Sequence, residues 1–449
     1  MASRRLSADI IGVFGARTLW TILGTISGVI LARKLGPYDR GILALVLLLP
    51  QTVVTFVKLG ITQANVYFIN REGRSAEQVA SNSNALAWAL GIVVSALVWL
   101  LQGSLASILR GVAPWALALT LVRVPLCLLD DYLYGVLQAV GHFKLYNTRL
   151  LVSEAVRLVL IVAALMVFHY GLFAAVLIHT VVNVFNIAWL VITMQRFIPF
   201  GFRVDRQLLG QQLTFGVKSY VQTLTGHMLL RSDVYMVSYY LGPAETAFYS
   251  LALRFTEMVL EIPQAVGLVL YPKLASLPEH EVHQLTAQAC RRTLLLTGSC
   301  VLVLALFGPW ILTLWYGQAY APAGKPLIWA AIGALSMSVF VILTRDFTSQ
   351  NRQKVNIAAG VPALGLNLAL NFFMIPHFGI VGAAMSTAIA YSTACIVLLV
   401  FYLPQARVSL SDVMIAKPED LRFFWNLVRR GGRRVGLRSA SASVNPRTP

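Results

Sequence analysis

Stretches of about twenty mostly apolar residues recur along the whole 449-residue chain, and they restrict its fold more than any other feature. A helix of that length crosses the roughly 30 Å hydrocarbon core of a membrane. Hydrophobic residues make up 57% of the chain and charged residues only 12%, against about 25% charged in a typical soluble domain. The chain is therefore predicted to be an all-α polytopic membrane protein, and soluble enzymes, secreted disulfide scaffolds and disordered regulators are excluded.

Twelve transmembrane helices are expected, separated by short connections. The predicted spans are 11–31, 42–68, 84–102, 113–137, 149–168, 171–193, 211–240, 247–272, 292–315, 326–344, 355–375 and 379–402. The longest extramembrane connection in this prediction is the inner loop at 273–291. The four cysteines are scattered singly and form no CxxC pair, so neither a disulfide framework nor a metal site is expected.

The distribution of basic residues predicts the orientation. With a cytoplasmic N-terminus, 24 of the 36 Lys and Arg residues lie in or beside cytoplasmic segments and 5 lie in outer loops, among them Arg33, Lys34 and Arg40. The positive-inside rule then places both termini in the cytoplasm. The net charge of +18 follows mainly from this topology, so nucleic acid is not expected as a partner. The basic tail at 405–449 is predicted to lie against anionic membrane lipids and to be partly disordered.

Matching motifs divide the chain into two halves. Phe14-Gly-Ala-Arg17 is matched by Phe215-Gly-Val-Lys218, and Leu35-Gly36-Pro37 by Leu241-Gly242-Pro243. His169-Tyr-Gly-Leu172 is matched by His377-Phe-Gly-Ile380. Three matches in order predict two six-helix lobes, at 1–200 and 201–404. Because six is an even number, the lobes form parallel repeats related by a pseudo-two-fold axis along the membrane normal, which is a transporter architecture.

One stretch resembles a family signature. Residues 367–384 read NLALNFFMIPHFGIVGAA, which is similar to the N-x-x-x-N-x-x-x-I-P-x-x-G-x-x-G-A-A pattern of polysaccharide-biosynthesis (Wzx-type) oligosaccharide flippases. Arg231-Ser-Asp233, the following Leu241-Gly242-Pro243 with Tyr249, and Gln138-Ala-Val-Gly141 also resemble this family. It belongs to the superfamily of multidrug, oligosaccharidyl-lipid and polysaccharide exporters. The resemblance covers about residues 8–404 and implies a flippase for an undecaprenyl-diphosphate-linked oligosaccharide in the bacterial inner membrane.

Cations inside the spans are the candidate substrate-binding residues, because a charge in a membrane is costly unless it faces a cavity or a partner. Arg17 and Lys218 occupy equivalent positions of the two repeats, and the resemblance implies that their spans line the cavity between the lobes. Two such cations suit a diphosphate, which accepts charge-assisted hydrogen bonds. The alternative is that both side chains snorkel to the inner surface. Arg231 and Lys58 are the further candidates for the diphosphate and the cavity.

Three acids are candidates for ion coupling. Asp233 is the first, with a structural salt bridge as its alternative. Glu257 and Glu261 share one helix face, where a carboxylate pair could carry a proton; an ion pair between Arg254 and Glu257 is the competing interpretation. Asp130 and Asp131 lack the spacing of metal-binding aspartates and are expected to cap a helix at the interface. Glu154 and Arg157 are expected to pair.

Two other functions remain open at this point. A cation-coupled drug or metabolite antiporter of the same superfamily would need a predominantly anionic cavity. The first, second and seventh predicted spans instead carry four cations, Arg17, Lys58, Lys218 and Arg231, against one acid, Asp233. A membrane-bound polysaccharide polymerase or glycosyltransferase would need a large catalytic loop. No Walker A, GxSxG or HExxH motif occurs in the sequence, so no cofactor, metal or enzymatic activity is expected. Glycosyltransferases and a polymerase are the expected protein partners.

Overall fold

The protein is described by a computed structural model. It covers residues 2–422, with the side chains of 2–18, 143, 144, 218, 219, 221, 222, 279 and 280 left outside the description. Residues 423–449 of the predicted basic tail, Arg429 and Arg433 among them, lie outside the described residues.

Helices make up nearly all of the described chain. The elements are α1 (Ala2–Val57), α2 (Ile61–Asn70), α3 (Ala76–Leu100), α4 (Gln102–Leu105), α5 (Pro114–Ala139), α6 (Phe143–Val162), the π-helix η1 (Ala163–Val167), α7 (Leu172–Met194), α8 (Arg206–Leu241), α9 (Pro243–Leu274), α10 (Glu279–Tyr316), the 3₁₀-helix η2 (Gln318–Ala323), α11 (Gly324–Ser349), α12 (Gln353–Ala406) and α13 (Leu410–Met414).

Helices cover the positions of all twelve predicted spans. Between residues 2 and 422, α1 and α12 are each bent into two arms, at Gly36 and Gly379, and eight further long helices complete the twelve. Seven of the described helices are apolar enough to cross a membrane on composition alone, with α1 and α12 each counted once. α5, α8 and α9 are not among these seven, and they carry most of the charged residues within the spans.

The chain reverses sharply at one end of the bundle, at Gly36 between the two arms of α1 and at Gly242 between α8 and α9. Gly36 has φ 73° and ψ 173°, and Gly242 has φ 90° and ψ −173°. This backbone region is essentially open only to glycine. A proline follows each glycine and begins the next helix, where its missing N–H costs nothing. Gly111 and Gly317 are a second left-handed pair, also 206 residues apart, so the structure adds a repeat match that the sequence comparison missed.

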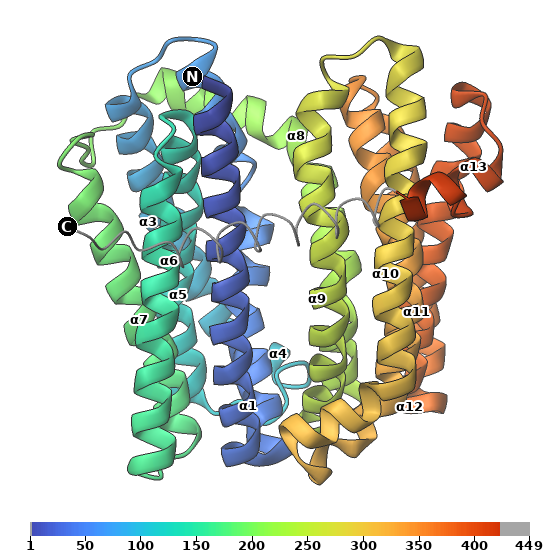
Figure 1. Cartoon of the computed structure of the whole chain (residues 1–449). Coiled ribbons are helices and arrows are strands. Elements are labelled where there is room, and N and C mark those ends of the chain that lie inside the picture. The colour runs from blue at the N-terminus through green and yellow to red at the C-terminus, as the bar shows by residue number, and fades with distance from the viewer. Residues whose placement is uncertain (1, 423–449) are drawn as a thin grey trace, which may run out of the picture.

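We call this end of the molecule the Gly36 end, and the opposite end, where Asn70 and α13 lie, the Asn70 end. The helices form two bundles that stand side by side, with α1 to α7 in one and α9 to α12 in the other (Figure 1). Within the expected inner loop at 273–291, α10 already begins at Glu279, so only a short turn separates it from α9.

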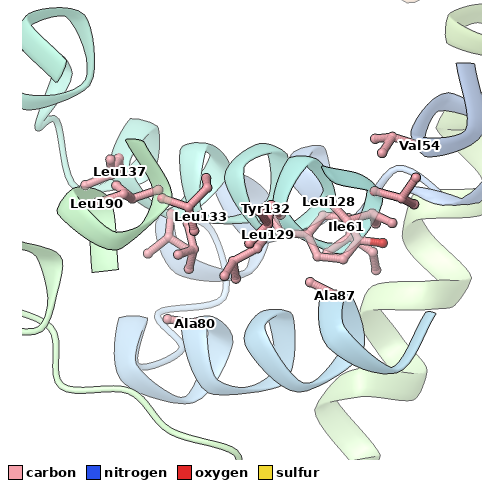
Figure 2. Packing of buried hydrophobic residues seen from close by; sticks show 14 of the residues in the cluster. Val54, Ile61, Ala80, Ala87, Leu128, Leu129, Tyr132, Leu133, Leu137 and Leu190 are labelled. Atoms are coloured by element: carbon pink, nitrogen blue, oxygen red, sulfur yellow. The ribbon is translucent and has the colours of Figure 1, made fainter. Parts of the chain in front are cut away.

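Each lobe has its own packed interior. In the first lobe, Leu128, Leu129 and Leu133 of α5 point toward α2 and α3, and Tyr132 lies fully buried beside them (Figure 2). The second lobe contains separate clusters around α9, α11 and α12. Because lipid tails are as apolar as leucine, tight van der Waals packing and interhelical hydrogen bonds hold such lobes together more than hydrophobic burial does.

Candidate substrate cavity between the lobes

Direct contacts close the molecule at the Gly36 end. Arg33 of α1 donates a hydrogen bond from Nε to the carbonyl of Trp315 at 2.7 Å. The hydroxyl of Tyr320 donates to the carbonyl of Ala32 at 2.8 Å. A Cβ added to Gly41 would lie 1.7 Å from the carbonyl oxygen of Pro243, so the two backbones touch. The two lobes therefore meet across this end.

At the Asn70 end, α8 joins the lobes. Gln212, in its first half, donates to Asn65 at 2.8 Å and accepts from Asn82 at 3.1 Å. The second half of α8 packs into the other lobe, where Val234 and Val237 are buried. Figure 1 shows α8 passing from the upper end of the first bundle to the side of α9. A single helix thus belongs to both lobes.

A break in the second span lies beside α8. The chain leaves helical geometry between α1 and α2, where Leu59 has φ 49° and Gly60 has φ 69°. A Cβ on Gly60 would lie 2.3 Å from the carbonyl oxygen of Gly216, and one on Gly216 would lie 2.2 Å from that of Leu59. Lys58 stands at this break and its ammonium is 3.6 Å from the carboxylate of Asp131. The predicted cation Lys58 therefore has an acidic partner in the first lobe.

Arg231 and Glu257 form the ion pair that bridges α8 and α9. Nη1 of Arg231 lies 2.5 Å from Oε1 of Glu257, and Nη1 of Arg254 lies 3.5 Å from Oε2 of the same residue. Each of the three side chains is about one-third exposed. Glu257 is therefore held by two arginines, and the ion pair with Arg254 that was the competing interpretation is present. Glu261 lies one turn further along α9 and is half-buried.

Asp233 lies in a buried polar cluster of the second lobe. Its Oδ2 accepts hydrogen bonds from the hydroxyl of Tyr249 at 2.5 Å and from that of Thr387 at 3.0 Å. Asn367 donates to Thr387 at 3.4 Å, and Asn371 donates to Asn367 at 3.0 Å. All five side chains are at most 1% exposed. The expected alternative, a salt bridge to a neighbouring helix, is wrong for the described contacts, because hydroxyl groups hold this carboxylate.

Basic residues outnumber acids inside the first lobe. Arg157 pairs with Glu154, as expected. Arg123 has two buried guanidinium nitrogens, and Arg40 has one, without a hydrogen-bond partner among the described residues. Arg40 was expected in an outer loop, but it lies in the second arm of α1 because the helix begins immediately after Gly36. The interior thus offers guanidinium groups that can still donate.

The expectation that Asp130 and Asp131 cap a helix at the interface is wrong. Both lie inside α5, well before its end at Ala139. Asp130 accepts from the fully buried Arg149 at 2.6 Å, and Asp131 accepts from Thr62 at 2.6 Å. Arg149 was missed at the sequence level, because it stood at the margin of a predicted span.

The remaining predicted residues are Arg17 and Lys218. Arg17 lies in α1 and Lys218 lies in α8, the two helices that contain the equivalent spans of the predicted repeat. Their side chains lie outside the described part of the chain, so their role in the cavity stays a prediction. Two cavities are described: one of about 480 Å³ in the first lobe, beside Lys58 and Asp131, and one of about 530 Å³ between the lobes, lined by α1 and α10.

Comparison with solved structures shows the fold. The protein aligns with an inward-facing multidrug resistance MATE family transporter of the MOP superfamily, with a TM-score of 0.70 and 15% identity over 86% of this chain and 94% of that one. It also aligns with the lipid II flippase MurJ in an inward closed conformation, with a TM-score of 0.69 and 14% identity over 88% and 90% of the two chains. At this identity the likeness establishes the architecture and not the activity.

Comparison with known sequences gives the family. The "Probable low-salt glycan biosynthesis flippase Agl15" of Haloferax volcanii is 26% identical over 178 residues, 39% of this chain and 38% of that protein. The succinoglycan biosynthesis transport protein ExoT of Rhizobium meliloti is 27% identical over 319 residues, 69% and 61% of the two chains. The match thus spans less than two thirds of either relative. The sequence model of the polysaccharide biosynthesis protein family matches residues 7–277, more than half of the chain, and the protein belongs to that family.

Proposed function

We propose that this membrane protein flips an undecaprenyl-diphosphate-linked oligosaccharide from the inner to the outer leaflet of the cytoplasmic membrane by alternating access. The carrying observation is the partly exposed arginine pair, Arg231 and Arg254, at the meeting of two lobes that are sealed at one end. A diphosphate can accept charge-assisted hydrogen bonds from both guanidinium groups. Family membership and the glycan transporters among its relatives support this substrate class.

The proposed orientation places the Gly36 end outside. Both termini are then cytoplasmic, and the sealed Gly36 end makes this an inward-facing state. Glycosyltransferases would supply the cargo on the cytoplasmic side, and a polymerase would consume it outside. A reporter enzyme that is active only outside the cytoplasm should work when fused near Gly317 and be silent after Leu403; the reverse pattern would contradict the orientation.

We propose that Arg17, Lys218 and Lys58 draw the diphosphate toward the arginine pair. Each of these cations is separated from the turn at Gly36 or Gly242 by more residues than Arg231 is. They therefore lie nearer the Asn70 end than Arg231 does. Asp233 is the proposed coupling group for a proton or sodium ion, because it is a fully buried carboxylate surrounded by neutral oxygen-bearing groups. Such intramembrane acids commonly mark ion pathways.

The test is flipping by the full-length protein in proteoliposomes. Undecaprenyl-diphosphate-linked oligosaccharide is supplied in one leaflet, and the accessible sugar is digested by an added glycosidase. We expect protein-dependent transfer that Arg231→Ala with Arg254→Ala abolishes and that the surface change Lys354→Ala leaves intact. Asp233→Asn should remove any dependence on a proton or sodium gradient. Transfer no faster than in protein-free liposomes would overturn the proposal, and drug accumulation by the same preparation would support the antiporter instead.

A further inference from the structure

A cavity with mainly polar lining residues lies in the first lobe, apart from the arginine pair. The cavity of about 480 Å³ lies between α2 and α5, within the range of about 300–1,000 Å³ typical of small-molecule sites. Thr62 and Gln63 line it from α2, and Asp131, Tyr134 and Gln138 line it from α5. The α5 residues are three and four positions apart, so they share one face of that helix. Two facing stripes of polar side chains therefore line the cavity, together with Val66 of α2.

The charges in this cavity cancel. Lys58, at its edge, lies 3.6 Å from Asp131, whose other oxygen accepts from Thr62 at 2.6 Å. A phosphate would meet a single cation here, Lys58, whose attraction is weakened by its pairing with Asp131. A cationic drug would find no spare acid among these lining residues. The site therefore favours a neutral polar ligand.

The side chains that remain suit a sugar. Gln63 and Gln138 are exposed amides, and an amide both donates and accepts hydrogen bonds, as a pair of adjacent sugar hydroxyls does. Tyr134 is half-buried, with its ring centroid 4.3 Å from that of Tyr146. A tyrosine fixed in this way presents an apolar ring with a polar tip, which matches the mixed C–H and O–H faces of a pyranose.

The position of the cavity fits a cargo held at its diphosphate by the arginine pair. Arg231 lies eleven residues before Gly242, about 16 Å from the Gly36 end at 1.5 Å per residue. Asp131 lies seventeen residues after Pro114, about 25 Å from the same end. The cavity is thus displaced toward the Asn70 end, so a head group would extend from the diphosphate away from the sealed end.

We propose that the cavity formed by Thr62, Gln63, Asp131, Tyr134 and Gln138 is a saccharide subsite that selects the head group of the lipid-linked cargo. The inference rests on the proposed function, because it assigns the sugar part of the same substrate. The exposed amides of Gln63 and Gln138 would gain ligand hydrogen bonds only from a lipid that carries the sugar, and this difference is how a hydrogen-bonding site discriminates between ligands.

The experiment compares lipids with and without a sugar on the full-length protein in nanodiscs. The probes are undecaprenyl diphosphate and its derivatives carrying glucose, galactose, N-acetylglucosamine or N-acetylgalactosamine, with affinity read by thermophoresis. We expect the wild type to bind at least one sugar-bearing lipid about tenfold more tightly than undecaprenyl diphosphate. Gln63→Ala and Gln138→Ala should each reduce that preference about fivefold, as expected for a lost hydrogen bond, and leave the affinity for undecaprenyl diphosphate unchanged.

Gln353→Ala is the matched control, because Gln353 is an exposed glutamine at the start of α12, outside the cavity. It should change neither affinity. An equal affinity for all five lipids, or a parallel loss for both kinds of lipid in the glutamine variants, would overturn the subsite. Failure of every lipid to bind the wild type would instead overturn the proposed function.

Discussion

Arg149 lies 2.6 Å from Asp130, and this ion pair fastens α6 to α5 inside the first lobe. The Arg149 side chain is fully buried, and its guanidinium group lies 5.0 Å from the centre of the Tyr146 ring. Nη1 also donates to the carbonyl of Asn186 on α7 at 3.4 Å. One side chain therefore links three helices of the lobe that carries the proposed saccharide subsite.

Replacing Arg149 should destabilise the protein strongly. Arg149→Ala leaves the Asp130 carboxylate without its partner in a poorly solvated interior, which costs about 3–5 kcal/mol in comparable buried pairs. The measurement is the free energy of unfolding in detergent. Asp131→Asn is the control, because its pair with Lys58 is longer and more exposed, and it should cost about 1 kcal/mol or less. Equal losses for the two variants would show that Arg149 is not the structural link described here.

The contact of Gly216 with Leu59 predicts that alanine substitutions at two glycines of α8 differ in their effect on stability. Gly216→Ala would place a Cβ 2.2 Å from the carbonyl oxygen of Leu59, so α8 must move away from the first lobe. We expect a loss of about 1–3 kcal/mol in the free energy of unfolding, as for an overpacked site. Gly226→Ala lies on the same helix with nothing within 4 Å of the added carbon, and should be neutral or stabilising. A stable Gly216→Ala variant would contradict the described contact.

The sequence contains enough local information to predict the helices but not their side-chain partners. Apolar runs and the Leu-Gly-Pro turns at Gly36 and Gly242 depend on neighbouring residues, so the twelve spans and the repeat could be predicted. Arg231 pairs with Glu257 on another helix, and Asp233 accepts a hydrogen bond from Thr387, 154 residues away. No periodicity encodes such contacts. Glu257 accordingly looked like half of a carboxylate pair, although two arginines hold it.

Ion pairs should hold the start of the C-terminal tail against α10 at neutral pH. Asp420 accepts from Nε of Arg291 at 2.8 Å and from Nε of Arg292 at 3.0 Å. Burial raises the pKa of Asp420, but hydrogen bonds from Arg291, the Lys417 backbone and Arg292 lower it below its ordinary value overall. Because the pKa is lowered, the stabilisation by these ion pairs is fully present above the ordinary aspartate pKa, near 4. It is lost as the pH falls through the lower pKa of the folded protein.

Hydrogen exchange over residues 410–420, corrected for intrinsic rates, should therefore be equally slow at pH 7 and pH 5. Asp420→Asn should exchange faster at both pH values. Glu419→Gln, at an exposed neighbouring position, should behave as the wild type. Release of the wild-type segment already at pH 5 would contradict the lowered pKa.

Arg17 should be required for export if it grips the diphosphate. Arg17→Ala is then expected to abolish export at normal abundance, and Arg17→Lys to be partly active, because lysine keeps the charge but loses the bidentate fork. If the side chain only snorkels, lysine should substitute fully and alanine should mainly lower abundance. The measurement is complementation of polysaccharide export in a flippase-deficient strain, normalised to the amount of protein in the membrane. Full export by Arg17→Ala would remove this residue from the cavity.

Glu257 should act as an internal competitor for the substrate. It bonds to Arg231 and Arg254, so a diphosphate that uses these arginines must displace its carboxylate. Glu257→Gln removes the competing charge, and we expect it to bind undecaprenyl diphosphate about tenfold more tightly, in keeping with about 1.5–3 kcal/mol for a hydrogen bond to a charged group. Flipping should nevertheless slow, because the carboxylate no longer helps to expel the product.

Arg231→Ala provides the opposite case, since it should weaken binding and slow flipping together. Thermophoresis with undecaprenyl diphosphate and the proteoliposome assay measure the two quantities for each variant. If Glu257 only holds α8 to α9, Glu257→Gln should lower the free energy of unfolding and weaken binding as Arg231→Ala does. Tighter binding combined with slower turnover is the result that separates competition from simple scaffolding, because lost packing does not increase affinity for the substrate.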